Sequence, residues 1–138
     1  MVRFLDTNIL LRYLTRDDER KADASFNLLL KVERAEEIVV TTDLVISEVV
    51  FTLQSSRSYN LPRETIRERL EPIISLRGLR LPLKSVYTRV FDLYCESGVS
   101  FVDAYSAAYM ENRGIDEVYS YDTDFDRIPG IIRVEPEE

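Results

Sequence analysis

Two short apolar runs near the start of the chain, each followed by polar residues, predict strands. The first covers Val2 to Leu5 and ends at Asp6, and the second covers Ile38 to Val40 and ends in Thr41-Thr42-Asp43. Between them, apolar residues recur at helical spacing and predict an amphipathic helix near residues 17 to 35. The residues that carry this spacing are Ala22, Phe26, Leu29 and Leu30.

The same helical spacing returns three more times along the chain. It is carried by Ile66, Leu70, Ile73 and Ile74, by Val86, Val90, Leu93 and Tyr94, and by Phe101, Ala104, Tyr105 and Ala108. Pro72 is expected to kink or break the first of these helices, because proline removes an intrahelical hydrogen bond. Gly98 and Gly114 are expected to end the other two, as glycine commonly does.

The C-terminal part of the chain predicts two more strands joined by a polar connection. Val118 to Ser120 forms the first, Asp122 to Arg127 the connection, and Ile131 to Val134 the second, after the Pro129-Gly130 turn. Strands and helices therefore alternate, which predicts an α/β fold with a parallel sheet and helices on both faces. In such sheets ligands bind beyond the carboxyl ends of the strands. We expect residues 1–138 to form a single domain.

Composition is that of a soluble globular protein, with 45% hydrophobic and 31% charged residues. Neither a targeting segment nor a membrane span is expected, so the predicted compartment is the cytoplasm. The chain has no histidine and one cysteine, Cys95. This excludes catalysis through histidine, histidine metal sites, sites built on several thiolates and an internal disulfide. Any catalysis must use carboxylates, hydroxyls, Lys, Arg or a metal.

The formal charge of -7 argues against broad nonspecific binding of nucleic acid, which relies on a basic surface. It does not exclude a nuclease, because a cation held by acidic residues returns positive charge where a phosphate must bind. Of the 18 basic residues, all but Lys21, Lys31 and Lys84 are arginine, the better bidentate partner for phosphate.

Two carboxylates in the first half of the chain are candidates for a site. Asp6 directly follows the first strand and is therefore expected at the carboxyl edge of the sheet; the alternative is an ordinary helix N-cap. Glu48 lies in an apolar segment that predicts a largely buried helix, with Leu44, Val45, Phe51 and Thr52 on its face. The alternative is a solvated helix face, but a lone carboxylate among apolar neighbours is costly unless it is paired or bound to a metal.

Further candidate carboxylates lie in the second half. Asp103 ends Ser100-Phe101-Val102-Asp103, which has the form of a capping box; capping alone would explain it, yet a helix N-terminus also suits a phosphate. Asp122, Asp124 and Asp126 directly follow the predicted strand, where turn-forming Asp is common. Asp122 is nearest to the strand end.

A convergence of these acids would demand a cation. Like charges about 5 Å apart repel by about 3 kcal/mol per pair at an effective dielectric of about 20. Several such pairs would rival the whole folding stability of about 5 to 15 kcal/mol. Proton uptake or a divalent ion must relieve this repulsion, and a site made only of oxygen ligands suits Mg²⁺ or Mn²⁺.

Taken together, these residues resemble the PIN-domain nucleases, and within them the VapC-type toxins of toxin-antitoxin systems. The resemblance covers essentially the whole chain. It rests on four short motifs in order: Leu5-Asp6-Thr7-Asn8-Ile9-Leu10, Ile46-Ser47-Glu48-Val49, Val102-Asp103-Ala104 and Ser120-Tyr121-Asp122-Thr123-Asp124-Phe125. It implies a three-layer fold with a parallel sheet of about five strands, endonucleolytic RNA cleavage that depends on Mg²⁺ or Mn²⁺, a homodimer, and a cognate antitoxin that blocks the site.

On this basis we hypothesise a role for each candidate residue. The catalytic, metal-holding acids are Asp6, Glu48, Asp103 and Asp122, with Asp124 able to share or replace the role of Asp122. The cation is expected to lower the pKa of a water that attacks the phosphodiester and to stabilise charge on the phosphoryl oxygens. Thr7, Asn8 and Ser120 are expected to orient these acids or bound water, the alternative for Thr7 and Asn8 being a role in a turn only. Arg12 and Arg16 are candidates for contact with substrate phosphate, the alternative being solvated surface arginines.

Two other protein classes that place an acid after the first strand fit the sequence poorly, and one alternative remains. A haloacid-dehalogenase-like phosphatase would need a second acid two residues after Asp6, where Asn8 stands. A receiver-like domain would need a late lysine, and none follows Lys84. The strongest alternative is a catalytically silent PIN-like module that binds a partner protein, in which the acids only cap helices. The sequence leaves open the RNA target, the identity of the antitoxin, the choice and number of ions, and whether the protein is a toxin or a housekeeping nuclease.

Overall fold

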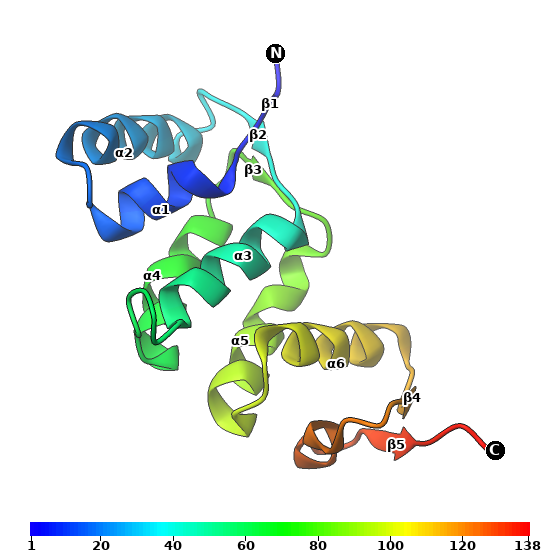
Figure 1. Ribbon diagram of the computed structural model, residues 1–138. Helices are drawn as coiled ribbons and strands as arrows, with labels where there is room; N and C mark the ends of the chain where they lie inside the picture. The colour runs from blue at the N-terminus through cyan, green and yellow to red at the C-terminus, as the bar shows by residue number, and fades with distance from the viewer. The chain divides into compact units, whose positions relative to one another are not determined.

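The computed structural model describes residues 1–138, which form two compact units, Met1–Lys84 and Ser85–Glu138 (Figure 1). The first unit contains β1 (Arg3–Phe4), α1 (Thr7–Thr15), α2 (Glu19–Glu33), β2 (Val39–Val40), α3 (Asp43–Gln54), α4 (Arg63–Ile74) and β3 (Leu79–Arg80). The second contains α5 (Tyr87–Ser97), α6 (Phe101–Arg113), β4 (Glu117–Tyr119), the 3-10 helix η2 (Thr123–Arg127) and β5 (Ile132–Val134). The 3-10 helix η1 (Lys84–Val86) connects them. None of the helices is both long enough and apolar enough to span a membrane.

The sheet of the first unit has three parallel strands in the order β1-β2-β3. Its central strand pairs Val39 with Arg3 on one side and with Leu79 on the other. The Oγ1 atom of Thr41, which is fully buried just after β2, donates to the carbonyl of Leu5 at 2.9 Å. This hydrogen bond fastens the end of β1 to the end of β2 and thereby fixes the backbone directly before Asp6.

Helix α2 confirms the helix predicted near residues 17 to 35. Its N-cap Asp18 accepts a hydrogen bond from the backbone N–H of Lys21 at 3.1 Å, and its buried apolar positions include Ala22 and Leu29. Figure 1 shows α1 and α2 side by side, and their packing buries Leu10 and Leu14 of α1. The apolar spacing therefore identified the helix and part of its packed face, whereas Phe26, which also carried the spacing, is exposed.

The break expected at Pro72 is not observed, because Pro72 lies inside α4, which continues to Ile74. Proline lacks the N–H that would bond to the carbonyl four residues earlier. In the last turn of a helix this removes one hydrogen bond without interrupting a following segment. Burial of Ile66, Leu70 and Ile73 against the rest of the unit holds the helix together across the proline.

Helices α5 and α6 pack against each other and form the core of the second unit. Four aromatic rings meet there with centroids 6.0 to 6.5 Å apart, those of Tyr87, Phe91, Tyr94 and Phe101. Both helices end at a glycine in the left-handed region, Gly98 at φ 67° and Gly114 at φ 70°, which confirms the two predicted helix ends.

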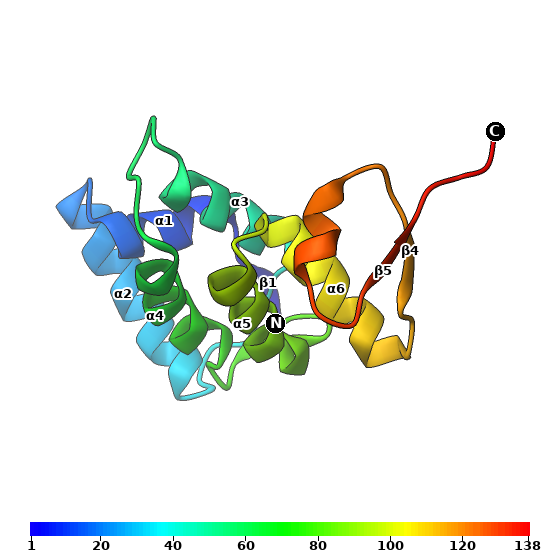
Figure 2. The same ribbon diagram turned by 90° about the horizontal axis from the view of Figure 1, so that it is seen from below.

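Strands β4 and β5 form a second parallel sheet, and Figure 2 shows them side by side with η2 in the connection. The register pairs Val118 with Arg133. Arg133 also donates to the carbonyl of Ser120 at 3.2 Å and to the carboxylate of Asp126 at 3.1 Å. These bonds tie the segment after β4 to β5.

The α/β class is confirmed, since six α-helices accompany five strands that pair only in parallel. The strands form one sheet of three and one of two. That residues 1–138 make a single domain stays a prediction.

Candidate functional site

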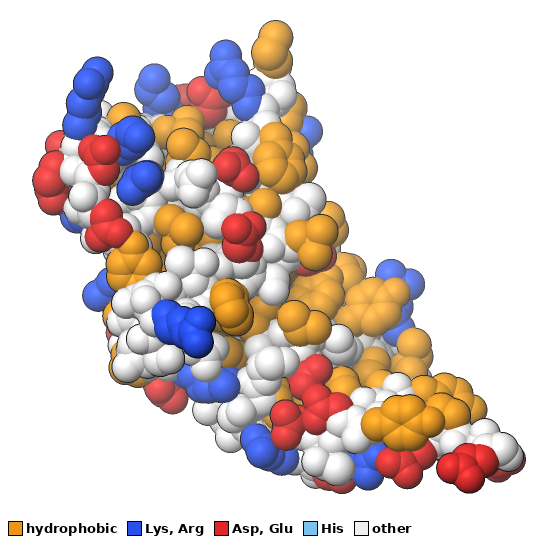
Figure 3. All heavy atoms as spheres, in the orientation of Figure 1, with side chains coloured by type: hydrophobic (Ala, Val, Ile, Leu, Met, Phe, Trp, Pro, Cys, Tyr) orange, Lys and Arg blue, Asp and Glu red, His pale blue; other side chains and the backbone are white.

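Three carboxylates lie together in the second unit. Asp103, Asp122 and Asp124 each offer a carboxylate oxygen, and these oxygens lie within 4.8 Å of one another. We call these three residues the acidic cluster. In Figure 3 acidic side chains gather over the region of α6 and η2, beside hydrophobic side chains over β4 and β5.

Asp103 is placed by the first turn of α6. The N-cap Ser100 accepts a hydrogen bond from the backbone N–H of Asp103 at 3.1 Å, and the Asp103 side chain is hydrogen bonded to Ser100 in turn. The capping interaction predicted from Ser-x-x-Asp is therefore present. Because a capped first turn is rigid, it also fixes the direction in which the carboxylate points.

The environment of Asp103 disfavours its charge. Burial raises the pKa of this carboxyl above its ordinary value, and the nearby charges of Asp122 and Asp124 raise it further, against a smaller opposite effect of the hydrogen bond to Ser100. A carboxylate in this state gains from any nearby positive charge. The cluster thus has the electrostatics of a cation-binding site.

Asp122 and Asp124 are held by the start of η2. Ser120 Oγ accepts from the backbone N–H of Asp122 at 2.9 Å, and Asp122 Oδ1 accepts from the N–H of Asp124 at 2.9 Å. Ser120 thus supports the backbone of the cluster. Arg127 contacts Asp124 Oδ1 at 3.2 Å, a contact that we did not predict, although its i,i+3 spacing was a usable signal.

The first unit holds the other two candidate acids. Asp6 follows β1 in an extended conformation at the N-cap position of α1, but its side chain makes no capping hydrogen bond. Asp6 therefore occupies the N-cap position, but its carboxylate does not cap the helix. Glu48 Oε2 accepts a hydrogen bond from Thr7 Oγ1 at 3.1 Å, and Thr7 is buried. Thr7 thus supports Glu48, whereas Asn8 is exposed.

The expectation that the helix around Glu48 is largely buried is wrong for the face that carries Glu48. Leu44 is 81% and Phe51 74% exposed on that face, and Glu48 is exposed as well. Helix α3 has apolar residues all round, but only the side with Val45, Ile46, Val49, Val50 and Leu53 is buried. Glu48 is therefore not a buried carboxylate that needs a metal to offset its desolvation. Its position is instead supported by the hydrogen bond from Thr7.

Of the two candidate arginines, Arg16 has its guanidinium engaged by two carboxylates of α2, those of Glu19 at 2.8 Å and Asp23. These hydrogen bonds raise the pKa of Arg16. Arg12 lies in the last turn of α1 and is half-buried. A role of either residue in binding phosphate stays a prediction.

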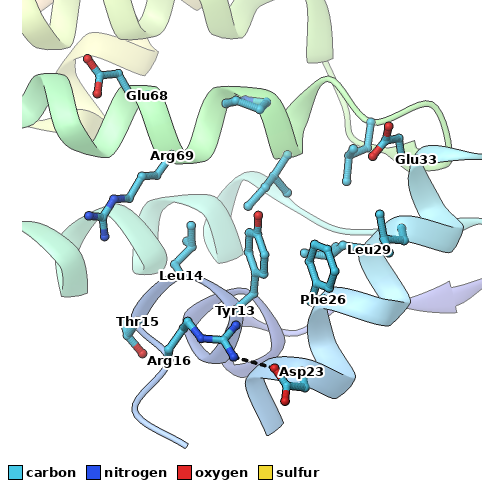
Figure 4. Close-up of a pocket in the computed structure, with 14 residues that line it drawn as sticks. Tyr13, Leu14, Thr15, Arg16, Asp23, Phe26, Leu29, Glu33, Glu68 and Arg69 are labelled. Atoms are coloured by element: carbon cyan, nitrogen blue, oxygen red, sulfur yellow. Dashed lines mark hydrogen bonds and ion pairs between the residues drawn. The ribbon is translucent and has the colours of Figure 1, made fainter. Parts of the chain in front are cut away.

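A groove of about 920 Å³ lies on the first unit, lined by residues of α1, α2 and α4. Its floor is apolar, with Leu14, Leu29 and Ile73. Tyr13 stacks on Phe26 inside it, with ring centroids 6.1 Å apart and planes at 11° (Figure 4). The spacing of apolar residues along the chain does not reveal this groove, because only the packing of three helices creates it.

Comparison with known proteins gives consistent matches along the chain. The PIN domain family model matches residues 3–131. A VapC ribonuclease of Aquifex aeolicus (strain VF5) is 27% identical over 137 residues, which is 99% of this chain and 98% of that protein.

Two solved structures also align with nearly the whole chain. A crystal structure of VapBC2 from Rickettsia felis, bound to a DNA fragment from their promoter, aligns at 16% identity and a TM-score of 0.41 over 98% of both chains. Mycobacterium tuberculosis VapC20, a toxin that cleaves the sarcin-ricin loop, aligns at 19% identity and a TM-score of 0.38 over 99% of this chain and 100% of that chain.

Proposed function

The chain belongs to the PIN-domain family, and we propose that it is a metal-dependent endoribonuclease that hydrolyses RNA phosphodiester bonds. The single observation that carries this proposal is the acidic cluster, whose three carboxylate oxygens lie within 4.8 Å of one another. The relative from Aquifex aeolicus, named as a VapC ribonuclease over nearly its whole length, supports the reaction type. The alternative of a silent binding module leaves the clustering of these charges unexplained.

The donor set of the cluster fits a hard divalent cation. It consists only of carboxylate oxygens, which Mg²⁺ and Mn²⁺ prefer, and the chain has no histidine to add a softer ligand. Asp103, Asp122 and Asp124 would hold the ion. We further propose that Asp6 and Glu48 serve the same ion, as the family resemblance implies.

When bound, such an ion lowers the pKa of a water and neutralises charge that builds up on the phosphoryl oxygens. The chain's own residues prepare the site. Ser120 and Ser100 fix the backbone on which the carboxylates of Asp122 and Asp103 stand, and Thr7 holds the carboxylate of Glu48. Because these groups are ordered beforehand, little reorganisation is needed when substrate binds.

We test the proposal with a panel of labelled RNAs, cut by highly purified wild type and by Asp6→Asn in Mg²⁺, Mn²⁺ or EDTA. Discrete cuts are expected with wild type and either ion, and they should vanish with EDTA, which removes the cation, and with the substitution, which removes one of its proposed ligands. Equal cutting by wild type and variant would indicate a contaminating nuclease. No cutting under any condition, after removal of any copurified protein, would favour the silent module.

We also propose that the protein is the toxin of a toxin-antitoxin pair, a cytoplasmic homodimer whose cognate antitoxin docks in the groove between α1, α2 and α4. The groove offers an apolar floor and the exposed ring of Phe26 at its edge. This shape and chemistry suit the apolar face of an amphipathic helix. Tyr13, stacked on Phe26, would then be one of its central contacts.

Phe26→Lys is expected to weaken binding of the cognate antitoxin by at least about thirtyfold, as the loss of an interface hot spot of about 2 kcal/mol would. Ile115→Lys, at an exposed apolar residue of the second unit, is the control and should bind as wild type does. The measurement is titration calorimetry of each variant with the antitoxin, with light scattering to report whether the toxin is a dimer. Equal affinity of the two variants would place the antitoxin elsewhere.

A further inference from the structure

Two of the eight tyrosines have no partner in the structure, Tyr119 and Tyr121. Tyr13 stacks on Phe26, Tyr59 donates a hydrogen bond to Asp17, Tyr87, Tyr94 and Tyr105 make ring contacts, and Tyr109 lies under the guanidinium of Arg113. Tyr119 is 76% and Tyr121 72% exposed. Their rings and hydroxyls therefore contribute little to the packing of the second unit.

Tyr121 stands directly before Asp122 of the acidic cluster, on a backbone that is held on both sides. Ser120 donates its N–H to the carbonyl of Val134 at 3.1 Å and receives a hydrogen bond from Arg133 on its own carbonyl. Asp122 donates its N–H to Ser120 Oγ at 2.9 Å. The exposed ring is thus presented from an ordered segment beside the proposed cation site.

The charge of the protein limits how it can hold RNA. With a net charge of -7 and three carboxylates at the proposed site, electrostatic attraction of the RNA backbone is weak outside the cation itself. Stacking of bases on aromatic rings does not depend on net charge and tolerates any base, because every base has a π face. RNA-binding proteins use Tyr in this way for unpaired bases.

We propose that Tyr121 stacks on an unpaired RNA base next to the phosphate that is cleaved, and that this contact supplies affinity for single-stranded substrate. The inference rests on the proposed function, because it takes RNA as the substrate. It assigns RNA as the binding partner of the exposed ring. The test below also detects the alternative, in which Tyr121 contacts a second copy of the chain.

Tyr121→Ala is expected to raise the KM for a short single-stranded RNA about tenfold and to change kcat less than about twofold. Tyr121→Phe keeps the ring and should behave as wild type. Tyr109→Ala, on the exposed surface of α6, is the matched control and should also leave KM unchanged. Because Tyr121 is exposed, neither of its two substitutions should alter the melting temperature, which is measured for all three variants in parallel.

A second substrate locates the contact on the RNA. Replacing the base that flanks the mapped cleavage site by an abasic residue should raise the KM of wild type by the same factor, and should add nothing further to Tyr121→Ala. The inference would be overturned if the increases in KM from the abasic residue and from Tyr121→Ala multiplied when the two were combined. It would also be overturned if Tyr121→Ala had the KM of wild type. A change in dimerisation by Tyr121→Ala with KM unaltered would assign the ring to a second copy.

The inference and the proposed function fail in different ways. If wild type cuts RNA and Tyr121→Ala cuts it with the same KM, only the inference fails. If wild type cuts nothing, binding is measured instead by titrating RNA that carries the fluorescent base 2-aminopurine in Ca²⁺. Quenching of its fluorescence by wild type but not by Tyr121→Ala would support the stacking contact and reject the nuclease function. Absence of both cutting and quenching overturns both.

Discussion

Asp103→Asn is expected to lower the rate of RNA cleavage about a thousandfold, which corresponds to about 4 kcal/mol of lost transition-state stabilisation. Burial and the charges of Asp122 and Asp124 raise the pKa of Asp103, so a bound cation would favour its charged form. Asparagine keeps the size of the side chain but removes the charge that holds the ion. The measurement is a single-turnover cleavage rate with saturating protein in Mg²⁺ and in Mn²⁺.

Asp126→Asn is the matched control for this substitution. Asp126 lies on the same 3-10 helix as Asp124, but it pairs with Arg133 and does not belong to the acidic cluster. Cleavage by this variant should stay within about twofold of wild type, because a surface ion pair contributes little. If both variants lose activity alike, the general acidity of the segment matters and the cluster is not the site.

Thermal unfolding distinguishes loss of the ion from loss of the fold. Mn²⁺ should raise the melting temperature of wild type, since a ligand that binds only the folded state stabilises it by mass action. Asp103→Asn should respond to Mn²⁺ much less, while its melting temperature without the ion stays at or above that of wild type, because one repelling charge is gone. A variant that unfolds at a clearly lower temperature without the ion would have lost activity through its fold.

The helices of this protein were predictable where an apolar stripe and a cap coincide. Gly98 and Gly114 end α5 and α6 as their sequence position indicated, since glycine adopts the left-handed conformation without strain. The strand β3 at Leu79–Arg80 was not predicted, because it does not lie in a continuous apolar run: Arg77 and Gly78 precede it and Pro82 follows closely. Its partner β2 defines it through the hydrogen bond from Thr41 N–H to the Arg80 carbonyl at 3.0 Å.

The sequence predicted the local position of each acid of the candidate site, but not which acids lie close together in space. The capping box around Asp103 and the strand end before Asp122 are local features, and both are present. Local pattern does not show that Asp103 and Asp124 approach each other, since that follows from how α6 packs relative to η2. The same limit explains the error for α3, whose sequence is apolar all round although only one face is buried.

Phe91→Ala is expected to destabilise the protein by about 3 to 5 kcal/mol, the usual cost of removing a large ring from a packed core. Phe91 is fully buried, and its ring lies 6.0 Å from that of Phe101 and 6.5 Å from that of Tyr94, centroid to centroid. Since Phe101 begins α6, loosening this contact also loosens the first turn that carries Asp103. Denaturant unfolding measures the loss, with Phe51→Ala as the control.

Phe51 is 74% exposed, so the same truncation there should cost less than about 0.5 kcal/mol. Activity adds a second readout, because a loosened α6 should lower the affinity of the acidic cluster for Mn²⁺ even at temperatures where Phe91→Ala is folded. A destabilisation below about 1 kcal/mol would mean that the aromatic contacts between α5 and α6 do not hold the second unit together. Full destabilisation with unchanged Mn²⁺ affinity would mean that the capping bonds around Ser100 alone fix Asp103, independently of the core beneath it.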